Sequence, residues 1–372
     1  MMIMSLSAIA LFIGILLILV VVHEFGHFIA AKLTGMRVDE FAFGFPPRIF
    51  GKKIGETTYA INAIPLGGYV SIFGENGSEE DKKAHGATHH PRAFGNRPWW
   101  AQLLVLVAGV TMNMVLALII FIGISYGEVK MSVDDEVYGT RVKNPALIVV
   151  EVSKESPAYK AGIIPGSTIL SMTSAGTVAP LTTATSLVAF IGTHNNSPFT
   201  ITYLAPDNQK KTTTVAAVYG IIPDKKALGI ALDQIGTVKI SAKEAIPLGY
   251  ERTVTMTKMT FDGLTSVFTS LFAGKSVLSS LSGPVGIAKI VGETSEYGYD
   301  AVLTLVAALS VNLALFNILP LPALDGGRMV VVLIEAITKK KVPFKYYSWV
   351  NVIGFGLLML LLIIVTINDL KH

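Results

Sequence analysis

The chain of 372 residues contains no cysteine, which excludes disulfide bonds and thiolate metal ligands. Charged residues are also absent from four long segments: 3–22, 103–126, 301–324 and 349–367. Each segment is about long enough to cross the ~30 Å hydrocarbon core of a bilayer as a helix. With 51% hydrophobic residues and a mean hydropathy of +0.57, the sequence predicts an α-helical polytopic membrane protein with four transmembrane helices.

No basic residue precedes the first apolar segment, and that segment is long, so we expect a retained helix rather than a cleaved secretory signal. A large excess of positive charge is lacking as well. The net charge of +4 gives no indication of a nucleic-acid partner.

The basic residues that are present gather in two loops, one between the first and second apolar segments and one between the third and fourth. They are Arg37, Arg48, Lys52, Lys53, Lys82, Lys83, Arg92 and Arg97 in the first loop, and Lys339, Lys340, Lys341 and Lys345 in the second. The positive-inside rule places both loops in the cytoplasm. Both termini and the long middle segment then face outward, although the acidic residues 79–81 weaken the bias of the first loop.

The first apolar segment ends in the motif His23-Glu24-Phe25-Gly26-His27. Residues four apart lie on one face of a helix, so both imidazoles can bind one zinc ion while Glu24 reaches a water molecule there. The alternative is a pair of interfacial histidines beside a helix-end glutamate. Ionisable residues at the end of a membrane-length segment are costly, and their position therefore favours a functional site.

The third apolar segment carries a second polar cluster that ends in Asp325. Pro320 and Pro322 cannot continue a regular helix, so we expect the chain to unwind there and to resume its helix after Asp325. The carboxylate of Asp325 could cap that helix, or it could complete a His, His, Asp zinc site. The incomplete pair of histidines favours the ligand role, because a catalytic zinc normally takes three protein ligands.

Between the first two helices, short alternating segments at 43–49, 57–64 and 69–72 predict a β-hairpin or small sheet close to the metal helix. Its edge could pair with an extended peptide, although an ordinary cytoplasmic hairpin fits the pattern equally well. Residues 241–282 have apolar positions at helical spacing. This helix could lie on the outer leaflet or pack against the middle domain.

The sequence as a whole resembles the site-2 protease family of intramembrane zinc metalloproteases, in particular the bacterial RseP-type regulators. The resemblance rests on HEFGH at 23–27, FGFPPRI at 43–49, IPLGGYV at 64–70, SGPVGIA at 282–288 and NILPLPALDGG at 317–327. It implies that His23, His27 and Asp325 bind Zn²⁺ and that Glu24 is the catalytic base. It also implies substrate positioning by four residues of the third segment: Asn312, Asn317, Pro320 and Pro322.

The resemblance further implies a PDZ-like β domain outside the cytoplasm and a multi-pass location in the bacterial inner membrane. Its expected substrates are single-span membrane proteins, such as anti-sigma factors or remnant signal peptides, which the hairpin would pair with. Two departures are present. The family's Ala-Gly-Pro is here Ala108-Gly109-Val110, for which we expect a packing change, and only one PDZ-like domain fits, whereas some relatives carry two.

We therefore expect seven regions. They are transmembrane helix 1 (1–34), a cytoplasmic loop with a membrane-associated β-hairpin (35–98), transmembrane helix 2 (99–126), the PDZ-like domain (127–240), an amphipathic linker (241–299), transmembrane helix 3 (300–338), and a basic loop with transmembrane helix 4 (339–372). Two other functions compete with proteolysis. A membrane adaptor would need neither motif, and a zinc transporter would more plausibly show internal repeats and polar residues along several helices.

Overall fold

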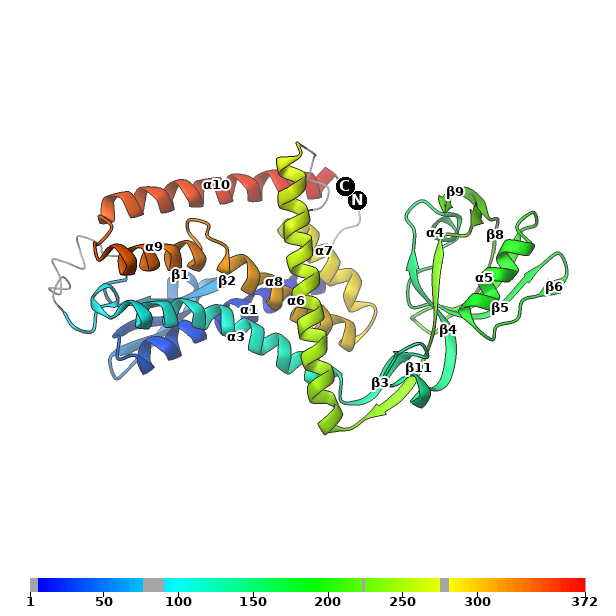
Figure 1. The fold of residues 1–372 in the computed structure, drawn as a ribbon, viewed down its shortest axis with the longest axis horizontal. Helices are drawn as coiled ribbons and strands as arrows, with labels where there is room; N and C mark the ends of the chain where they lie inside the picture. The colour runs from blue at the N-terminus through cyan, green and yellow to red at the C-terminus, as the bar shows by residue number, and fades with distance from the viewer. Residues whose placement is uncertain (1–5, 76–89, 223–224, 275–280, 372) are drawn as a thin grey trace. The chain divides into compact units, whose positions relative to one another are not determined.

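The computed structural model describes residues 6–75, 90–222, 225–274 and 281–371 (Figure 1). The chain divides into two compact units. One unit is helical and combines residues 1–123 with residues 247–372, and the other is mainly β and consists of residues 124–246.

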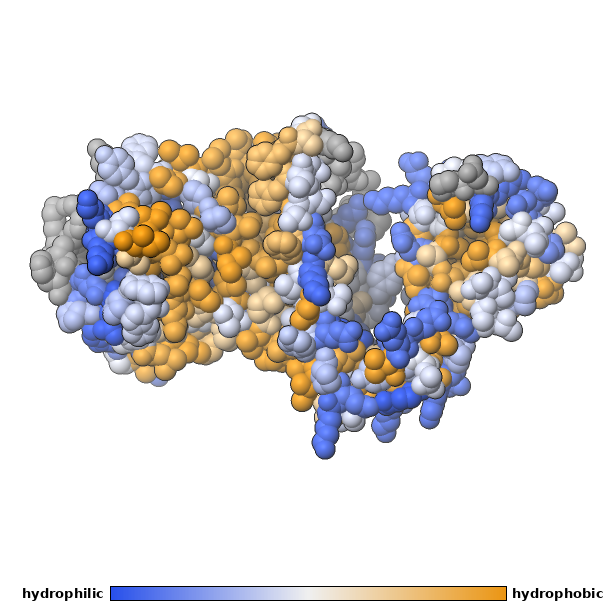
Figure 2. Space-filling model, in the orientation of Figure 1, coloured by the Kyte–Doolittle hydropathy of each residue, from blue (hydrophilic) through white to orange (hydrophobic). Residues whose placement is uncertain are grey.

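Four helices of the first unit are long and apolar enough to cross a membrane, as the charge-free segments predict. They are α1 (Leu6–Leu33), α3 (Trp99–Ile124), α8 (Tyr299–Ile318) and α10 (Phe344–Lys371). Apolar side chains cover much of the visible face of this unit (Figure 2). The structure thus contains four apolar helices of membrane length where the sequence predicts them.

Helices α1 and α3 approach each other closely because small residues line their contact. A Cβ atom on Gly26 would lie 2.3 Å from the carbonyl oxygen of Ala108, a separation that no side chain tolerates. Helix α8 joins them through the Ser310 hydroxyl, which donates a hydrogen bond to the carbonyl oxygen of Asn113 at 2.8 Å. These three helices form the core that surrounds the histidine motif.

The predicted hairpin consists of β1 (Val38–Ile54) and β2 (Thr57–Ile72), which are antiparallel. Residues 38–43 of β1 lie between two parts of β2, its beginning on one side and residues 68–72 on the other. Residues 48–54 pair with the opposite side of the beginning of β2. The hairpin is thus a small sheet of four segments in which 68–72 form an edge. The segments 57–64 and 69–72, separate in the sequence pattern, belong to one strand, in which Gly67 adopts φ +142°.

The third apolar segment is interrupted as the prolines predict. Helix α8 ends at Ile318 and helix α9 (Asp325–Thr338) begins at Asp325. The turn between them is tight, because Cβ atoms on Gly326 and Gly327 would lie 2.1 Å and 2.2 Å from the carbonyl oxygens of Leu319 and Leu321. Glycine is therefore required at both positions if Asp325 is to begin the new helix.

Two further helices, α6 (Ala242–Phe272) and α7 (Pro284–Ser295), complete the helical elements around this core, with a 3₁₀ turn (Phe94–Asn96) before α3. Helix α6 lies against α3, where a Cβ on Gly249 would lie 2.5 Å from a side-chain carbon of Ile122. The end of α10 is fixed to the start of α7, because the Asp369 carboxylate accepts a hydrogen bond from the Gly286 N–H at 2.8 Å.

The second unit is built on a seven-stranded antiparallel sheet in the order β3-β11-β4-β5-β7-β8, with β6 paired to β5, and a separate two-stranded ladder of β9 and β10. The strands are β3 (Gly127–Ser132), β4 (Lys143–Val152), β5 (Thr168–Ser174), β6 (Thr177–Val178), β7 (Phe199–Leu204), β8 (Lys210–Val215), β9 (Val218–Ile222), β10 (Lys225–Ala227) and β11 (Ile230–Ile240). A 3₁₀ turn (Gly139–Arg141) and the helices α4 (Pro157–Lys160) and α5 (Ala184–Thr193) complete the unit, whose core includes Leu187, Phe199 and Ile201.

Candidate active site

The structure brings one side-chain atom each of His23, His27 and Asp325 close together between α1 and the start of α9. The two Nε2 atoms of the histidines lie 3.1 Å apart, and Asp325 Oδ2 lies 2.9 Å from the first and 3.3 Å from the second. Both histidines are only 6% exposed. Residues 302 positions apart in the sequence therefore form one buried cluster.

These three atoms fit a zinc ion. Zinc binds histidine nitrogen and carboxylate oxygen at about 2.0–2.2 Å, which places tetrahedral ligands roughly 3.3 Å from one another. The observed separations of 2.9–3.3 Å match that spacing. Two imidazoles and one carboxylate are also a donor set of catalytic zinc sites, in which the fourth position stays open.

The side chain of Asp325 does not cap helix α9. The N-cap residue is Leu324, and no side chain makes a capping hydrogen bond there. The helix-cap interpretation of Asp325 is therefore wrong, and its carboxylate lies against the histidines instead.

Hydrogen bonds on the far sides of the rings orient both histidines. His27 Nδ1 donates to the carbonyl oxygen of Val105 at 2.8 Å, and the side-chain amide of Asn113 lies 3.3 Å from His23 Nδ1. The amide nitrogen faces the ring while Asn113 Oδ1, which is buried, has no partner among the described residues. Turning the amide over lets Oδ1 accept from the His23 Nδ1–H. Each Nε2 is then free for a metal.

In the sequence, Asn113 and the preceding Ala108-Gly109 indicate a small-residue face for helix packing, and a contact of Asn113 with His23 was not predicted. The signal that could have found it is its position four residues after Gly109, which places both on one face of α3. A Cβ on Gly109 would lie 2.5 Å from His27 Nε2 and 2.8 Å from His23 Cε1. Glycine at this position is what gives the metal-binding atoms their room.

Glu24 lies beside the cluster and lines a cavity of about 460 Å³ together with His27, Tyr69, Val70, Ser71, Glu75 and Asp325. Its Oε2 accepts a hydrogen bond from the Val70 N–H at 3.0 Å, so the edge segment of the hairpin holds this carboxylate in place. The cavity gives Glu24 and the open side of the cluster a common space.

A second interaction that sequence reasoning missed fixes α9. The guanidinium of Arg328, three residues after Asp325, forms an ion pair with the Glu75 carboxylate. It also donates to the Glu75 carbonyl oxygen at 2.7 Å and lies over the ring of Phe94 at 5.1 Å. The helix that carries Asp325 is thereby tied to the end of the hairpin.

The four residues expected to position a substrate make contacts with other parts of the chain than the metal-binding cluster. Asn312 Oδ1 accepts a hydrogen bond from the Thr260 hydroxyl of α6 at 2.8 Å. Asn317 lies in the last turn of α8, and Pro320 and Pro322 belong to the connection to α9. A Cβ on Gly354 of α10 would lie 2.2 Å from Pro322 Cβ. None of these four residues lines the cavity beside Glu24.

Comparison with known proteins agrees with this geometry. The family model of peptidase family M50 matches residues 11–361. A Clostridium acetobutylicum protein whose name describes it as a zinc metalloprotease is 33% identical over 357 residues, 95% of each chain. The zinc metalloprotease RasP of Geobacillus kaustophilus is 28% identical over 445 residues, covering 100% of this chain and 99% of the relative. The chain therefore belongs to peptidase family M50, the site-2 protease family, and is a zinc metalloprotease.

Proposed function

We propose that this protease hydrolyses peptide bonds within the transmembrane segments of single-span membrane proteins. The observation that carries the proposal is the place of the His23, His27 and Asp325 cluster, which lies on a membrane-length helix and at the interruption of a second one. A site built into such helices is suited to a substrate that is itself in the membrane.

In this proposal His23, His27 and Asp325 hold the metal, and Glu24 is the general base. Zinc, when bound, supplies a Lewis acid that lowers the pKa of water and polarises a carbonyl group. Glu24 accepts the proton of the attacking water at its carboxylate, which lines the cavity beside the cluster. The Val105 carbonyl and the Asn113 amide keep the imidazole rings in place during the reaction.

We assign substrate binding to the hairpin edge and to the chain before Asp325. Segment 68–72 is an edge of the small sheet and passes Glu24 at Val70, so an extended peptide paired with it would lie beside the base. The side of the substrate that faces away from segment 68–72 would be held by four residues: Asn312, Asn317, Pro320 and Pro322. For this, Asn312 has to exchange its hydrogen bond with Thr260 for one with the substrate.

The β unit is proposed to be a PDZ-like domain that faces away from the cytoplasm. Supporting this, β3 pairs only with residues 235–240 of β11, and β4 pairs with the other edge of that strand. The Val133 N–H, just after β3, donates to the Gln234 carbonyl at 2.8 Å, so the edge of 230–233 opposite β4 is the part that β3 leaves uncovered. A peptide can add to such an edge as a further strand.

The cluster of basic residues in the two loops supports an orientation with the active site near the cytoplasmic side of a bacterial inner membrane. We propose anti-sigma factors and remnant signal peptides as substrate classes. Both have a single membrane-spanning segment, which an intramembrane site of this kind could accept.

The test is cleavage of a panel of single-span substrates by the protease reconstituted in lipid vesicles. Glu24→Gln should abolish cleavage while the protein retains one equivalent of zinc, because the ligands are unchanged; a base of this kind contributes about 10²–10⁴-fold. A chelator should abolish wild-type cleavage, and added zinc should restore it. Gly123→Ala, in a position with nothing within 4 Å, is the control for substitution in the helices.

Undiminished cleavage by Glu24→Gln would contradict the role of this residue. Zinc bound at one equivalent without cleavage of any membrane substrate, but with cleavage of soluble peptides, would contradict the intramembrane proposal and leave the protease assignment intact.

A further inference from the structure

A second cavity lies between α1 and α3, on the side of their contact away from the metal site. It has a volume of about 530 Å³ and is lined by Gly26, Ile29, Ala30, Leu33, Trp100, Leu103, Leu104, Val107, Ala108, Thr111 and Met112. Thr111 brings the one hydroxyl group of this lining, and it donates to the Val107 carbonyl of its own helix at 2.9 Å. The groove therefore offers an occupant a mainly apolar surface, with the Trp100 indole as a polar group at one end.

The length of this groove fits one leaflet of a bilayer. From Trp100 to Met112 helix α3 rises about 18 Å, at ~1.5 Å per residue. One leaflet contributes about 15 Å to the hydrocarbon core of a bilayer. A groove that binds a transmembrane helix along its whole span would have to be about 30 Å long. An acyl chain of a lipid in one leaflet matches the groove better than a spanning protein helix does.

One end of the groove lies at the membrane interface. Trp100 lines it there, and Trp99 and Trp100 are 51% and 53% exposed at the start of α3. Tryptophan prefers the headgroup level of a bilayer. Leu33, the last residue of α1, lies at the same end, so the mouth of the groove is between the end of α1 and the beginning of α3.

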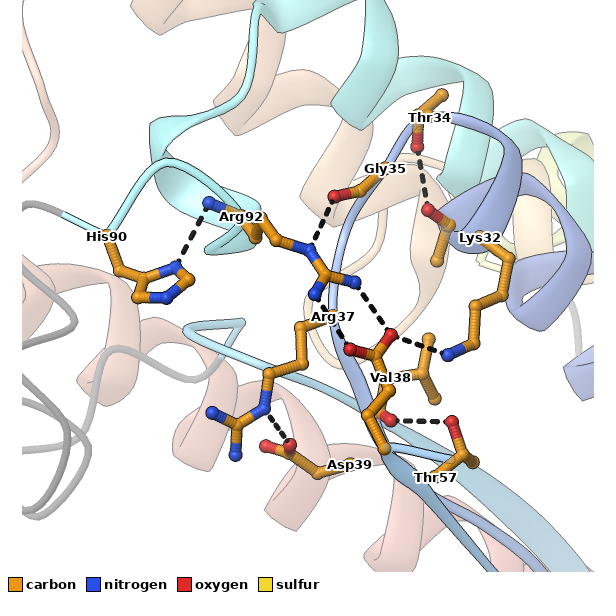
Figure 3. Close-up of polar contacts among 11 residues, drawn as sticks. Lys32, Thr34, Gly35, Arg37, Val38, Asp39, Thr57, His90 and Arg92 are labelled. Atoms are coloured by element: carbon orange, nitrogen blue, oxygen red, sulfur yellow. Dashed lines mark hydrogen bonds and ion pairs between the residues drawn. The ribbon is translucent and has the colours of Figure 1, made fainter. Parts of the chain in front are cut away.

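Arg97 is at this mouth and differs from the cations around it. Its two terminal guanidinium nitrogens donate to the carbonyl oxygens of Thr34 and Pro91, and its Nε–H is buried without a partner among the described residues. Four other cations of this unit are paired with a carboxylate, several of them in view in Figure 3: Lys32 and Arg92 with Glu56, Arg37 with Asp39, and Arg48 with Glu40. Within the described residues, no carboxylate pairs with Arg97.

We propose that this groove is a binding site for an anionic phospholipid, with one acyl chain between α1 and α3 and the phosphate of the headgroup at Arg97. The anionic lipids of the cytoplasmic leaflet supply such a ligand. The lipid lies behind the crossing of Gly26 and Ala108, and the next residue, Gly109, faces both histidines. The bound chain thus supports from outside the helix contact that positions the metal ligands on the inside.

The experiment uses the full chain with Trp99→Phe and Trp349→Phe, which leaves Trp100 as the one remaining tryptophan. This protein is reconstituted in phosphatidylcholine, and its fluorescence is titrated with phosphatidylglycerol or phosphatidylcholine brominated on the acyl chains. Brominated phosphatidylglycerol should quench Trp100 at a mole fraction roughly fivefold lower than brominated phosphatidylcholine, the preference given by one arginine near a membrane surface.

Arg97→Gln should remove this preference, and Arg97→Lys should retain it, which separates the charge from any general disturbance of the fold. Lys53→Gln, on the outer segment of the hairpin, is the matched control and should keep the preference. Equal quenching by both lipids, or a preference that survives Arg97→Gln, would overturn the proposal. Displacement of the lipid by a substrate helix would assign the groove to protein instead. The measurement needs neither zinc nor cleavage, so its result is independent of the proposed function.

Discussion

Helix α1 carries two polar clusters, one around His23 and His27 and one at Lys32, and the two are built in opposite ways. In the first, the histidine side chains are 8% exposed and lie against α3, where a side chain on Gly109 would clash with both rings and the Asn113 amide contacts His23. In the second, Lys32 and Arg92 share the Glu56 carboxylate, which is 32% exposed (Figure 3). A small displacement is costly in the buried cluster, whereas water can replace a lost partner at the exposed one.

The largest effect is expected from Gly109→Ala, which places a methyl group where the metal ligands are. The new Cβ would lie 2.5 Å from His27 Nε2, so we expect loss of bound zinc and at least a hundredfold loss of cleavage. Zinc content by elemental analysis and cleavage in vesicles measure both. Gly123→Ala on the same helix should bind zinc and cleave within about twofold of wild type, because nothing lies within 4 Å of its new Cβ.

Removing the orienting amide should have the next largest effect. Asn113→Ala leaves the ligands unchanged but frees the His23 ring, so zinc affinity should fall about 10–100-fold. Competition with a chelator of known affinity gives this number. Thr111→Val, which removes a hydroxyl bonded within its own helix, should leave the affinity unchanged. Equal affinities of Asn113→Ala and wild type would refute the orienting role.

A smaller effect is expected from the support that α10 gives to the loop before Asp325. The Asn351 side chain accepts from the Ala323 N–H at 3.2 Å, and Gly354 lies against Pro322. Gly354→Ala should push this loop and lower the cleavage rate about tenfold with zinc still bound, an estimate from the cost of misplacing reacting groups. Gly356→Ala, two residues away in open space, should retain the wild-type rate. Equal rates would mean that α10 does not support the loop.

The smallest effect is expected at the exposed cluster. The Arg92 guanidinium, followed by Lys32, lowers the pKa of Glu56 from 4.5 to about 2. A carboxylate with a lowered pKa stabilises the fold fully above its unfolded pKa, and that contribution is lost as pH falls from about 4.5 towards 2. Glu56→Gln should therefore reduce stability at pH 7 by about 1 kcal/mol or less and leave zinc binding intact.

Thermal unfolding in detergent at a series of pH values checks this. The difference between wild type and Glu56→Gln should shrink as the pH is lowered from 5 to 2. A difference that stays constant over this range would show that the charge of Glu56 does not produce the effect.

The sequence predicts the parts of the structure that depend on local patterns. Charge-free segments give the four helices, Pro320 and Pro322 give the interruption of α8, and the spacing of His23 and His27 gives one helix face. Asp325 could be added because a pair of histidines is an incomplete zinc site.

Contacts between distant segments could not be predicted in the same way. Nothing in the residues near Glu75 indicates an ion pair with Arg328, 253 positions away, and the alternation in β1 does not say that residues 38–43 pair on both sides. Asn113 in an apolar segment suggests helix packing as readily as a contact with His23. The hydrogen bond of Asn312 with Thr260 depends on the path of α6, whose amphipathic pattern fits several neighbours.

The hydrogen bond between Val70 and Glu24 has a consequence for the order of events. Because the Val70 N–H is given to the carboxylate, it is not used in the ladder with residues 38–43 and belongs to the open edge of the sheet. A peptide that adds to this edge competes with Glu24 for the same N–H. Arrival of the substrate would then release a lone pair of the base, so that the carboxylate gains its full capacity to take a proton only once there is a bond to cut.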